Sequence, residues 1–101
     1  MLTFFIGSWS NNVRCGHGTY HYPNGDLYDG YWLDNRRHGQ GAFRYSSTGS
    51  SIIYIGLWEN GFQEGEGTLY YPNFKYQGHF QRNIVSIIVF EFIGPHFQAF
   101  L

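Results

Sequence analysis

At 101 residues the chain has room for one small domain, and 22% of its residues are aromatic whereas only 13% are charged. Many rings and few charges exclude an intrinsically disordered chain, and a net charge of −1 provides no general attraction to nucleic acid. The single cysteine, Cys15, cannot form an internal disulfide, so a reducing, cytoplasmic setting is expected.

From its N-terminal end the chain repeats a five-residue motif, aromatic-x-Gly-x-aromatic. The motif occurs as FIGSW (5–9), YDGYW (28–32), YIGLW (54–58) and YQGHF (76–80). In the first three units a Gly-x-Gly follows at a fixed offset, as GHG (16–18), GQG (39–41) and GEG (65–67). Recurrence at such a period indicates a stack of similar supersecondary units, each too small to bury its own apolar face.

The spacing within each unit predicts a β-hairpin. Tyr28, Gly30 and Trp32 are two residues apart and therefore share one face of a strand, and the second strand alternates in the same way. Between the strands lie Asn-Asn (11–12), Asp-Asn (34–35) and Asn-Gly (60–61), which are typical of tight hairpin turns. Connections between the units are expected at 23–26, 47–50 and 72–74.

Glycine beside large rings predicts a specific kind of packing. A strand glycine leaves a hole on its face, and a ring from a neighbouring strand can lie over the exposed backbone. Each buried ring removes about 150–250 Å² from water, which offsets the extra entropy that glycine loses on folding. We therefore expect the glycines to act as sockets and the sheet core to contain Trp9, Tyr28, Gly30, Trp32, Tyr54, Gly56, Trp58, Tyr76, Gly78 and Phe80.

A second series of rings follows each Gly-x-Gly. A single-layer sheet cannot cover both of its own faces, and tyrosine and tryptophan are the usual anchors of protein interfaces. We expect these rings to form a groove for an extended or helical partner segment, with packing among themselves as the alternative. The residues concerned are Tyr20, Tyr22, Phe43, Tyr45 and Tyr71.

This pattern resembles the MORN repeat, whose units read roughly YxGxWxxGxxxGxG. The resemblance gives repeats near 5–27, 28–53 and 54–75 and a partial repeat at 76–83, so that 1–83 form the array and 84–101 an apolar tail outside the repeat. It implies an all-β fold, an elongated single-layer twisted antiparallel sheet of MORN repeat hairpins, used for protein–protein assembly. The apolar run in the tail could cap the open end of the sheet, and open edges would also allow a homo-oligomer.

More narrowly, residues 36–80 are similar to the radial spoke head MORN proteins of cilia and flagella. The similarity rests on RHGQG (37–41), the widened TGS loop (48–50), WxNGxQEG (58–65) and YPNFKYQGHF (71–80). It implies a structural component of the axonemal radial spoke head. The partners would then be other proteins of the spoke head or of a cytoskeletal assembly, and the location the cytoskeleton of a cilium or flagellum.

Motifs for catalysis, cofactors and metals are weak. No Gly-x-Gly opens a helix after a strand and no phosphate-binding Gly-Lys-Ser/Thr is present, so neither an enzyme nor a nucleotide cofactor is expected. Cys15, His17 and His21 are the best metal candidates, but a structural zinc site needs four ligands in a tetrahedron. We expect them to be solvent-facing polar residues and no metal to be bound.

The MORN resemblance also implies an alternative function, because MORN arrays are linked to phosphoinositide lipids at membrane–cytoskeleton junctions. Arg36 and Arg37 form the one basic cluster and would be the lipid-binding residues. A polybasic lipid site normally needs about four to eight clustered cations, so charges kept on hairpins for solubility are the simpler interpretation. A further alternative is the MORN region of a larger enzyme.

Overall fold

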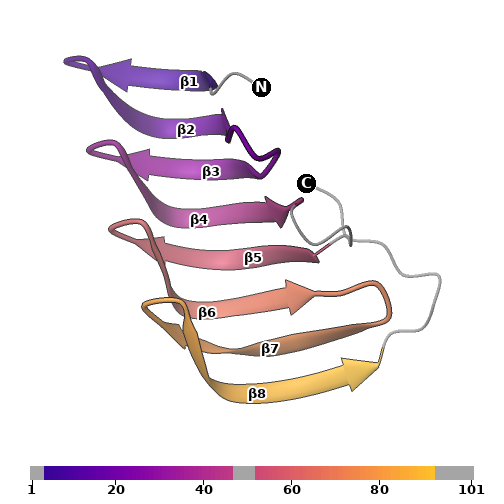
Figure 1. Ribbon diagram of the computed structural model, residues 1–101. Helices are drawn as coiled ribbons and strands as arrows, with labels where there is room; N and C mark the ends of the chain where they lie inside the picture. Colours follow the sequence, from indigo (N-terminus) through magenta and orange to yellow (C-terminus); the bar gives the residue numbers. More distant parts are fainter. Residues whose placement is uncertain (1–3, 47–51, 93–101) are drawn as a thin grey trace.

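The protein, described by a computed structural model over residues 4–46 and 52–92, is one open antiparallel sheet. Its eight strands follow one another in chain order (Figure 1). They are β1 (Phe4–Ser10), β2 (Val13–His21), β3 (Leu27–Leu33), β4 (Arg36–Tyr45), β5 (Ile52–Glu59), β6 (Phe62–Tyr70), β7 (Phe74–Gln81) and β8 (Ile84–Phe92). The predicted all-β, single-layer architecture is confirmed. In the described residues there is no helix long and apolar enough to cross a membrane.

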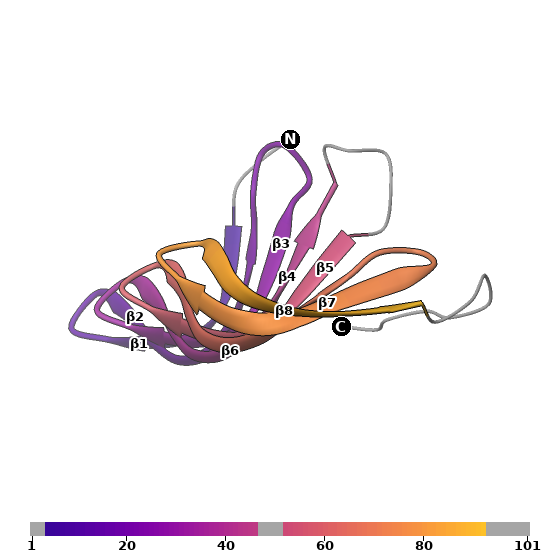
Figure 2. The ribbon, with the colours of Figure 1, turned by 90° about the horizontal axis from the view of Figure 1, so that it is seen from below.

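The sheet is elongated and strongly bent. Its principal extents are 44, 28 and 17 Å. Figure 2 shows that the strands are bent and that their directions fan out along the stack, so that the sheet forms a twisted trough instead of a plane. Contacts between strands are concentrated in consecutive pairs, as expected for a stack in which each unit touches only its neighbours.

Two-residue turns close the four hairpins, and all eight turn residues have φ between 48° and 89°. This conformation matches the twist of the flanking strands, which is why asparagine and glycine dominate these positions. The three predicted turns at 11–12, 34–35 and 60–61 are confirmed, and Arg82 and Asn83 form a fourth that the motif did not predict. Gly25 has φ of 92° in the connection at 23–26. The expected loop at 47–50 lies outside the described residues.

A line of glycines crosses the sheet at right angles to the strands. In six successive strand pairs a glycine lies directly opposite a glycine. A Cβ atom added to Gly56 would be 2.5 Å from the Cα atom of Gly67, a separation that real Cβ atoms essentially never show. We call this row the glycine line; its members are Gly7, Gly18, Gly30, Gly41, Gly56, Gly67 and Gly78.

The two glycines of each Gly-x-Gly have different roles. The second belongs to the glycine line, as predicted for a socket. The first glycine is not part of the glycine line. It has φ of 82° at Gly39 and 87° at Gly65, and it lies where the register of the hairpin shifts. The expectation that both glycines are sockets is therefore wrong for the first, whose left-handed backbone accommodates a β-bulge.

Tyrosine rings cover the glycine line. Tyr28 and Tyr54 are completely buried, and each ring lies over the glycine of the following strand, Gly41 or Gly67. The Tyr28 hydroxyl donates a hydrogen bond of 2.8 Å to the carbonyl oxygen three residues on, and Tyr54 makes the same bond at 2.9 Å. The predicted socket-and-ring packing is thus present in the second and third units.

The tryptophans join each unit to the one before it. Trp58 is 4% exposed, and its ring packs edge-on against Tyr54 of its own unit and Tyr28 of the preceding unit, at centroid distances of 5.2 and 5.3 Å. Its Nε1–H donates to the carbonyl oxygen of Gly41 at 3.2 Å. Trp32 repeats the arrangement with Gly18 at 3.1 Å. The core therefore runs along one face of the sheet, the ring face, without a break between units.

Two predicted core residues are placed differently. Trp9 is 56% exposed, because β1 is an edge strand and, in the described residues, no strand on its outer side supplies a ring or a carbonyl acceptor. Tyr76 is half-buried and packs edge-on against Tyr71 and Phe74. In this hairpin Ile88 stands opposite Gly78, where the other hairpins have a glycine.

The face opposite the rings and residues 84–92 also differ from what the repeat pattern suggests. Ile53 is buried on the face opposite the ring face. Residues 84–92, which were expected to form a tail, make strand β8, which pairs with β7 along its whole length and extends the sheet. Residues 93–101 lie outside the described residues.

The glycine line predicts a large penalty for a single methyl group. Gly41→Ala would place a Cβ atom 2.5 Å from the Tyr28 ring, and it should lower the free energy of unfolding by about 2–3 kcal/mol. Urea-induced unfolding followed by circular dichroism measures the change. The neighbouring exposed substitution Gln40→Ala should change it by less than about 0.5 kcal/mol, and equal effects of the two variants would contradict this packing.

Candidate functional site

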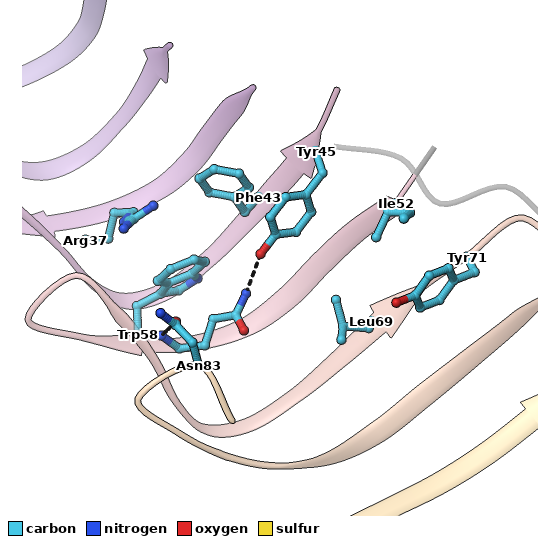
Figure 3. A pocket seen from close by; sticks show the side chains of 9 residues that line it. Arg37, Phe43, Tyr45, Ile52, Trp58, Leu69, Tyr71 and Asn83 are labelled. Atoms are coloured by element: carbon cyan, nitrogen blue, oxygen red, sulfur yellow. Dashed lines mark hydrogen bonds between the residues drawn. The ribbon is translucent and has the colours of Figure 1, made fainter. Parts of the chain in front are cut away.

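A groove of about 440 Å³ opens on the ring face between β4, β5 and β6. We call it the aromatic groove. Figure 3 shows the rings of Tyr45 and Tyr71 on the two sides of Ile52 and Leu69. Arg37 is the charged residue among the nine that line it, which are Arg37, Phe43, Tyr45, Ile52, Trp58, Gln63, Leu69, Tyr71 and Asn83.

The five rings predicted to bind protein are divided between this groove and a smaller one. Phe43, Tyr45 and Tyr71 line the aromatic groove. Tyr20 and Tyr22 line a hollow of about 210 Å³, one unit earlier, which also contains Trp32 and Arg37. Phe43 is buried and forms part of the floor, whereas the four tyrosines are half-buried and reach solvent. The repeat therefore generates two related concavities on one face.

Arginine side chains lie on the tryptophans, and sequence reasoning missed this role. The guanidinium carbon of Arg37 is 4.7 Å from the centroid of Trp58 and 5.4 Å from that of Phe43. Its Nη2 donates a 2.7 Å hydrogen bond to the carbonyl oxygen of Gly61, in the turn of the next unit. Arg14 lies over Trp32 in the same way, 4.7 Å from its centroid. The signal in the sequence is an arginine two residues before the first glycine of Gly-x-Gly.

In the third unit this position is Gln63, which is also buried and was also missed. Its Nε2 donates a 2.8 Å hydrogen bond to the Tyr45 hydroxyl oxygen, drawn as a dashed line in Figure 3. Its backbone N–H donates to Oδ1 of Asn83 at 2.8 Å, and the N–H of Asn83 donates back to the Gln63 carbonyl at 3.0 Å. The fourth turn is thereby attached to β6, and Tyr45 is held at the wall of the groove.

Burial sets the protonation state of one tyrosine in each hollow, Tyr45 in the aromatic groove and Tyr22 in the smaller one. It raises the pKa of the Tyr45 hydroxyl, although the hydrogen bond from Gln63 and the charge of Arg37 oppose the shift. The pKa of Tyr22 is raised for the same reason, again against the charge of Arg37. Both phenols are therefore neutral at physiological pH and able to donate a hydrogen bond to a ligand.

The two arginines proposed to bind lipid line the smaller hollow together with Arg14. Arg37 is half-buried and its guanidinium is engaged with Trp58 and Gly61. Arg36 is exposed and also lines a second hollow of about 540 Å³, at the turn edge, together with Arg82, Glu59 and Glu64. Three arginines therefore meet at one hollow, and two of them, Arg14 and Arg37, lie over tryptophan rings.

The metal candidates also point to different neighbours. His17 Nε2 is 3.2 Å from Oδ1 of Asp29, and the His21 ring stacks on Phe4 at a centroid distance of 4.1 Å. Within the described ranges no three His, Cys, Asp or Glu residues are grouped so that they could hold a metal ion.

Comparison with known protein families yields one match, the model described as the MORN repeat. It matches residues 5–27, 28–50 and 54–74, so each match begins at the first ring of a unit. A comparison with individual curated proteins gives no match.

The arginine contacts predict different effects for two adjacent residues. Arg37→Ala removes the stacking on Trp58 and the charged hydrogen bond to Gly61, and it should lower the free energy of unfolding by about 2–3 kcal/mol. Arg36→Ala, at an exposed position, should change it by less than about 0.5 kcal/mol. Chemical denaturation of both variants measures the difference, and similar values would refute the structural role of Arg37.

The buried tyrosines predict a loss of stability at high pH. Burial raises the pKa of Tyr28 and Tyr54 in the folded state, whereas in the unfolded chain these groups ionise near their ordinary value of about 10. The free energy of unfolding should be insensitive to these groups below about pH 9 and fall as the pH rises above 10. Urea midpoints measured from pH 7 to about 10.5 test this; a flat profile would be incompatible with neutral buried phenols.

Proposed function

This chain belongs to the MORN repeat family, and from that premise we propose that it is a non-enzymatic scaffold that binds a partner protein in the aromatic groove. MORN repeats are non-catalytic units that generally bind proteins or membranes. The choice between these two classes rests on one observation, the aromatic groove with its half-exposed tyrosines over a buried floor.

The chemistry of the groove suits a protein segment. Tyr45 and Tyr71 offer apolar area with a polar tip and few rotatable bonds, which is why tyrosine is enriched at binding interfaces. Ile52 and Leu69 add aliphatic surface between them. Because Gln63 holds Tyr45 through a hydrogen bond, part of the binding surface is ordered before the partner arrives, and less entropy is lost on binding.

We further propose that the assembly is the radial spoke head of a cilium or flagellum. The support is the similarity of residues 36–80 to radial spoke head MORN proteins in RHGQG, WxNGxQEG and the glycine-poor YPNFKYQGHF. A rigid sheet with a fixed repeat suits a structural position there, because it would hold partner segments at constant spacing.

The membrane alternative has weaker support. A phosphoinositide site needs several free cations on one surface. Arg14, Arg36 and Arg37 line one small hollow, but Arg14 and Arg37 are engaged with tryptophan rings. Arg36 also borders a second hollow that contains Glu59 and Glu64. Binding to lipid is therefore an outcome to be tested, not the function we favour.

The scaffold proposal predicts that loss of groove rings weakens partner binding. Tagged protein is added to detergent-extracted axonemes, and bound protein is measured after sedimentation. Tyr45→Ala and Tyr71→Ala should each weaken binding about tenfold or more. Tyr31→Ala is the matched control, because Tyr31 is 51% exposed but packs against His17 on the opposite face, and it should bind like the wild type.

Two results would contradict the proposal. Equal binding by all three variants would exclude the aromatic groove as the binding site. Three results together would favour the membrane function. The protein would float with phosphoinositide vesicles, this flotation would be lost at high salt and in Arg36→Ala, and the protein would not bind to extracted axonemes.

A further inference from the structure

The smaller hollow on the ring face carries positive charge that no carboxylate balances. Arg14, Arg36 and Arg37 line it, and its other lining residues are uncharged. Within the described residues, none of these arginines forms an ion pair with an aspartate or glutamate. Arg14 and Arg37 are also half-buried, so salt screens their charges less than it would at an exposed site. The smaller hollow therefore favours an anionic ligand.

The guanidinium groups of Arg14 and Arg37 are held in place and still have N–H groups to offer. Each lies over a tryptophan ring, with 4.7 Å between the guanidinium carbon and the ring centroid. Arg14 donates from Nε and Nη2 to oxygens of Asn35, at 3.1 and 3.2 Å. Arg37 donates from Nη1 to the Tyr22 hydroxyl at 3.4 Å and from Nη2 to the carbonyl oxygen of Gly61. Because a guanidinium has five N–H donors, each group can also donate to a ligand, and its fixed position lowers the entropy lost on binding.

Equivalent positions of the repeat are more polar in the smaller hollow than in the aromatic groove. Two residues before the first glycine of Gly-x-Gly, the hollow has Arg14 and Arg37, whereas the third unit supplies Gln63 to the groove. Two residues after the second glycine, the hollow has Tyr20 and the third unit has Leu69. Polarity therefore decreases along the stack from the hollow to the groove, and a bound segment with one polar and one apolar end has a favoured orientation.

The two hollows adjoin each other, with Arg37 between them. Arg37 lines both, and its guanidinium carbon lies 5.4 Å from the centroid of Phe43 in the aromatic groove. The rings of Phe43 and Tyr22, which lines the smaller hollow, have centroids 5.5 Å apart. Equivalent positions recur every two strands, and neighbouring strands are about 4.8 Å apart, so the hollows are separated by about 10 Å. An extended segment crosses this distance in about three residues.

We propose that the smaller hollow binds a carboxylate of the same partner segment whose apolar side chain occupies the aromatic groove. Because it concerns the segment in that groove, this inference rests on the proposed function. The segment is extended and carries Asp or Glu about three residues from an aromatic or large aliphatic residue. Its carboxylate accepts charge-assisted hydrogen bonds from Arg14 and Arg37, which are stronger than those between neutral groups. In the reverse orientation the carboxylate would lie beside Leu69 and Tyr71, without an arginine.

A protein carboxylate fits the smaller hollow better than a phosphoinositide headgroup. The volume of the hollow is about 210 Å³, below the roughly 300–1,000 Å³ of sites that enclose a whole small molecule. Its three arginines are fewer than the about four to eight cations of a polybasic lipid site. The hollow also continues into a groove lined by rings and aliphatic side chains, which suits the next residues of a peptide chain.

The first test uses random peptides displayed on phage and selected on the full chain. A length of about twelve residues is enough for an extended peptide to cross the whole sheet. The enriched peptides should carry Asp or Glu about three residues from an aromatic or large aliphatic residue, in one order along the peptide. Enriched peptides without the acidic position would overturn this inference and leave the scaffold function intact, whereas a lack of any enrichment would contradict both.

The second test locates the carboxylate with an enriched peptide and its amide counterpart, in which Glu or Asp is replaced by Gln or Asn. Titration calorimetry should show that the amide peptide binds the wild type about tenfold more weakly, with a smaller difference at high salt. Arg14→Gln should abolish this difference. Arg44→Gln is the matched control and should retain it, because Arg44 is exposed on the face opposite the ring face.

Circular dichroism verifies that Arg14→Gln keeps the sheet, and Arg36→Gln, at an exposed position, is a second variant that should reduce the difference. Equal binding of the acidic and amide peptides to the wild type would overturn the proposal. So would a difference that persists in both Arg14→Gln and Arg36→Gln. Displacement of the peptide by phosphoinositide vesicles, and not by phosphatidylcholine vesicles, would assign the hollow to a lipid headgroup instead.

Discussion

The close approach of glycine to glycine across each strand pair is the constraint on which the rest of this sheet depends. Only without Cβ atoms can a tyrosine ring lie flat over the neighbouring strand, as Tyr28 does over Gly41. Once the ring lies there, its hydroxyl reaches a carbonyl oxygen of its own strand, and the tryptophan of the next unit packs on its edge. Removing the glycine would displace each of these contacts in turn.

The same packing makes a single-layer sheet stiff without a second layer. Trp32 and Trp58 each donate to a carbonyl oxygen of the preceding unit. The carbonyl oxygen of each arginine or glutamine before Gly-x-Gly accepts a hydrogen bond from a backbone N–H in the next turn along the stack. The hairpins β3–β4 and β5–β6 therefore each donate two hydrogen bonds to the preceding hairpin, one from the tryptophan and one from the turn. A sheet built from such nearest-neighbour links behaves as a one-dimensional array, so a local defect propagates to adjacent units.

Core and binding surface are continuous in this fold. Trp58 is packed against Tyr28 on one side and lines the aromatic groove together with Tyr45 and Tyr71. A substitution in the groove floor consequently changes stability as well as recognition, whereas the half-exposed tyrosines at its walls can change recognition alone. In the described residues the two edges of the sheet differ from its middle: Trp9 lies on the edge strand β1, and the glycine line ends where Ile88 stands opposite Gly78.

The sequence alone determined the features that depend on local spacing. Alternation of rings and glycines predicted the strands and the buried residues Tyr28, Trp32, Tyr54 and Trp58, and the asparagine-rich pairs predicted three turns. It could not place residues whose environment is made by strands far apart in the chain. Gln63 is buried because Tyr45 and Asn83 contact it, and Trp9 is exposed because β1, in the described part of the chain, has a neighbouring strand on one side only. Only the tertiary structure decided these positions, since burial and stacking depend on which strands are adjacent, and local spacing does not contain that information.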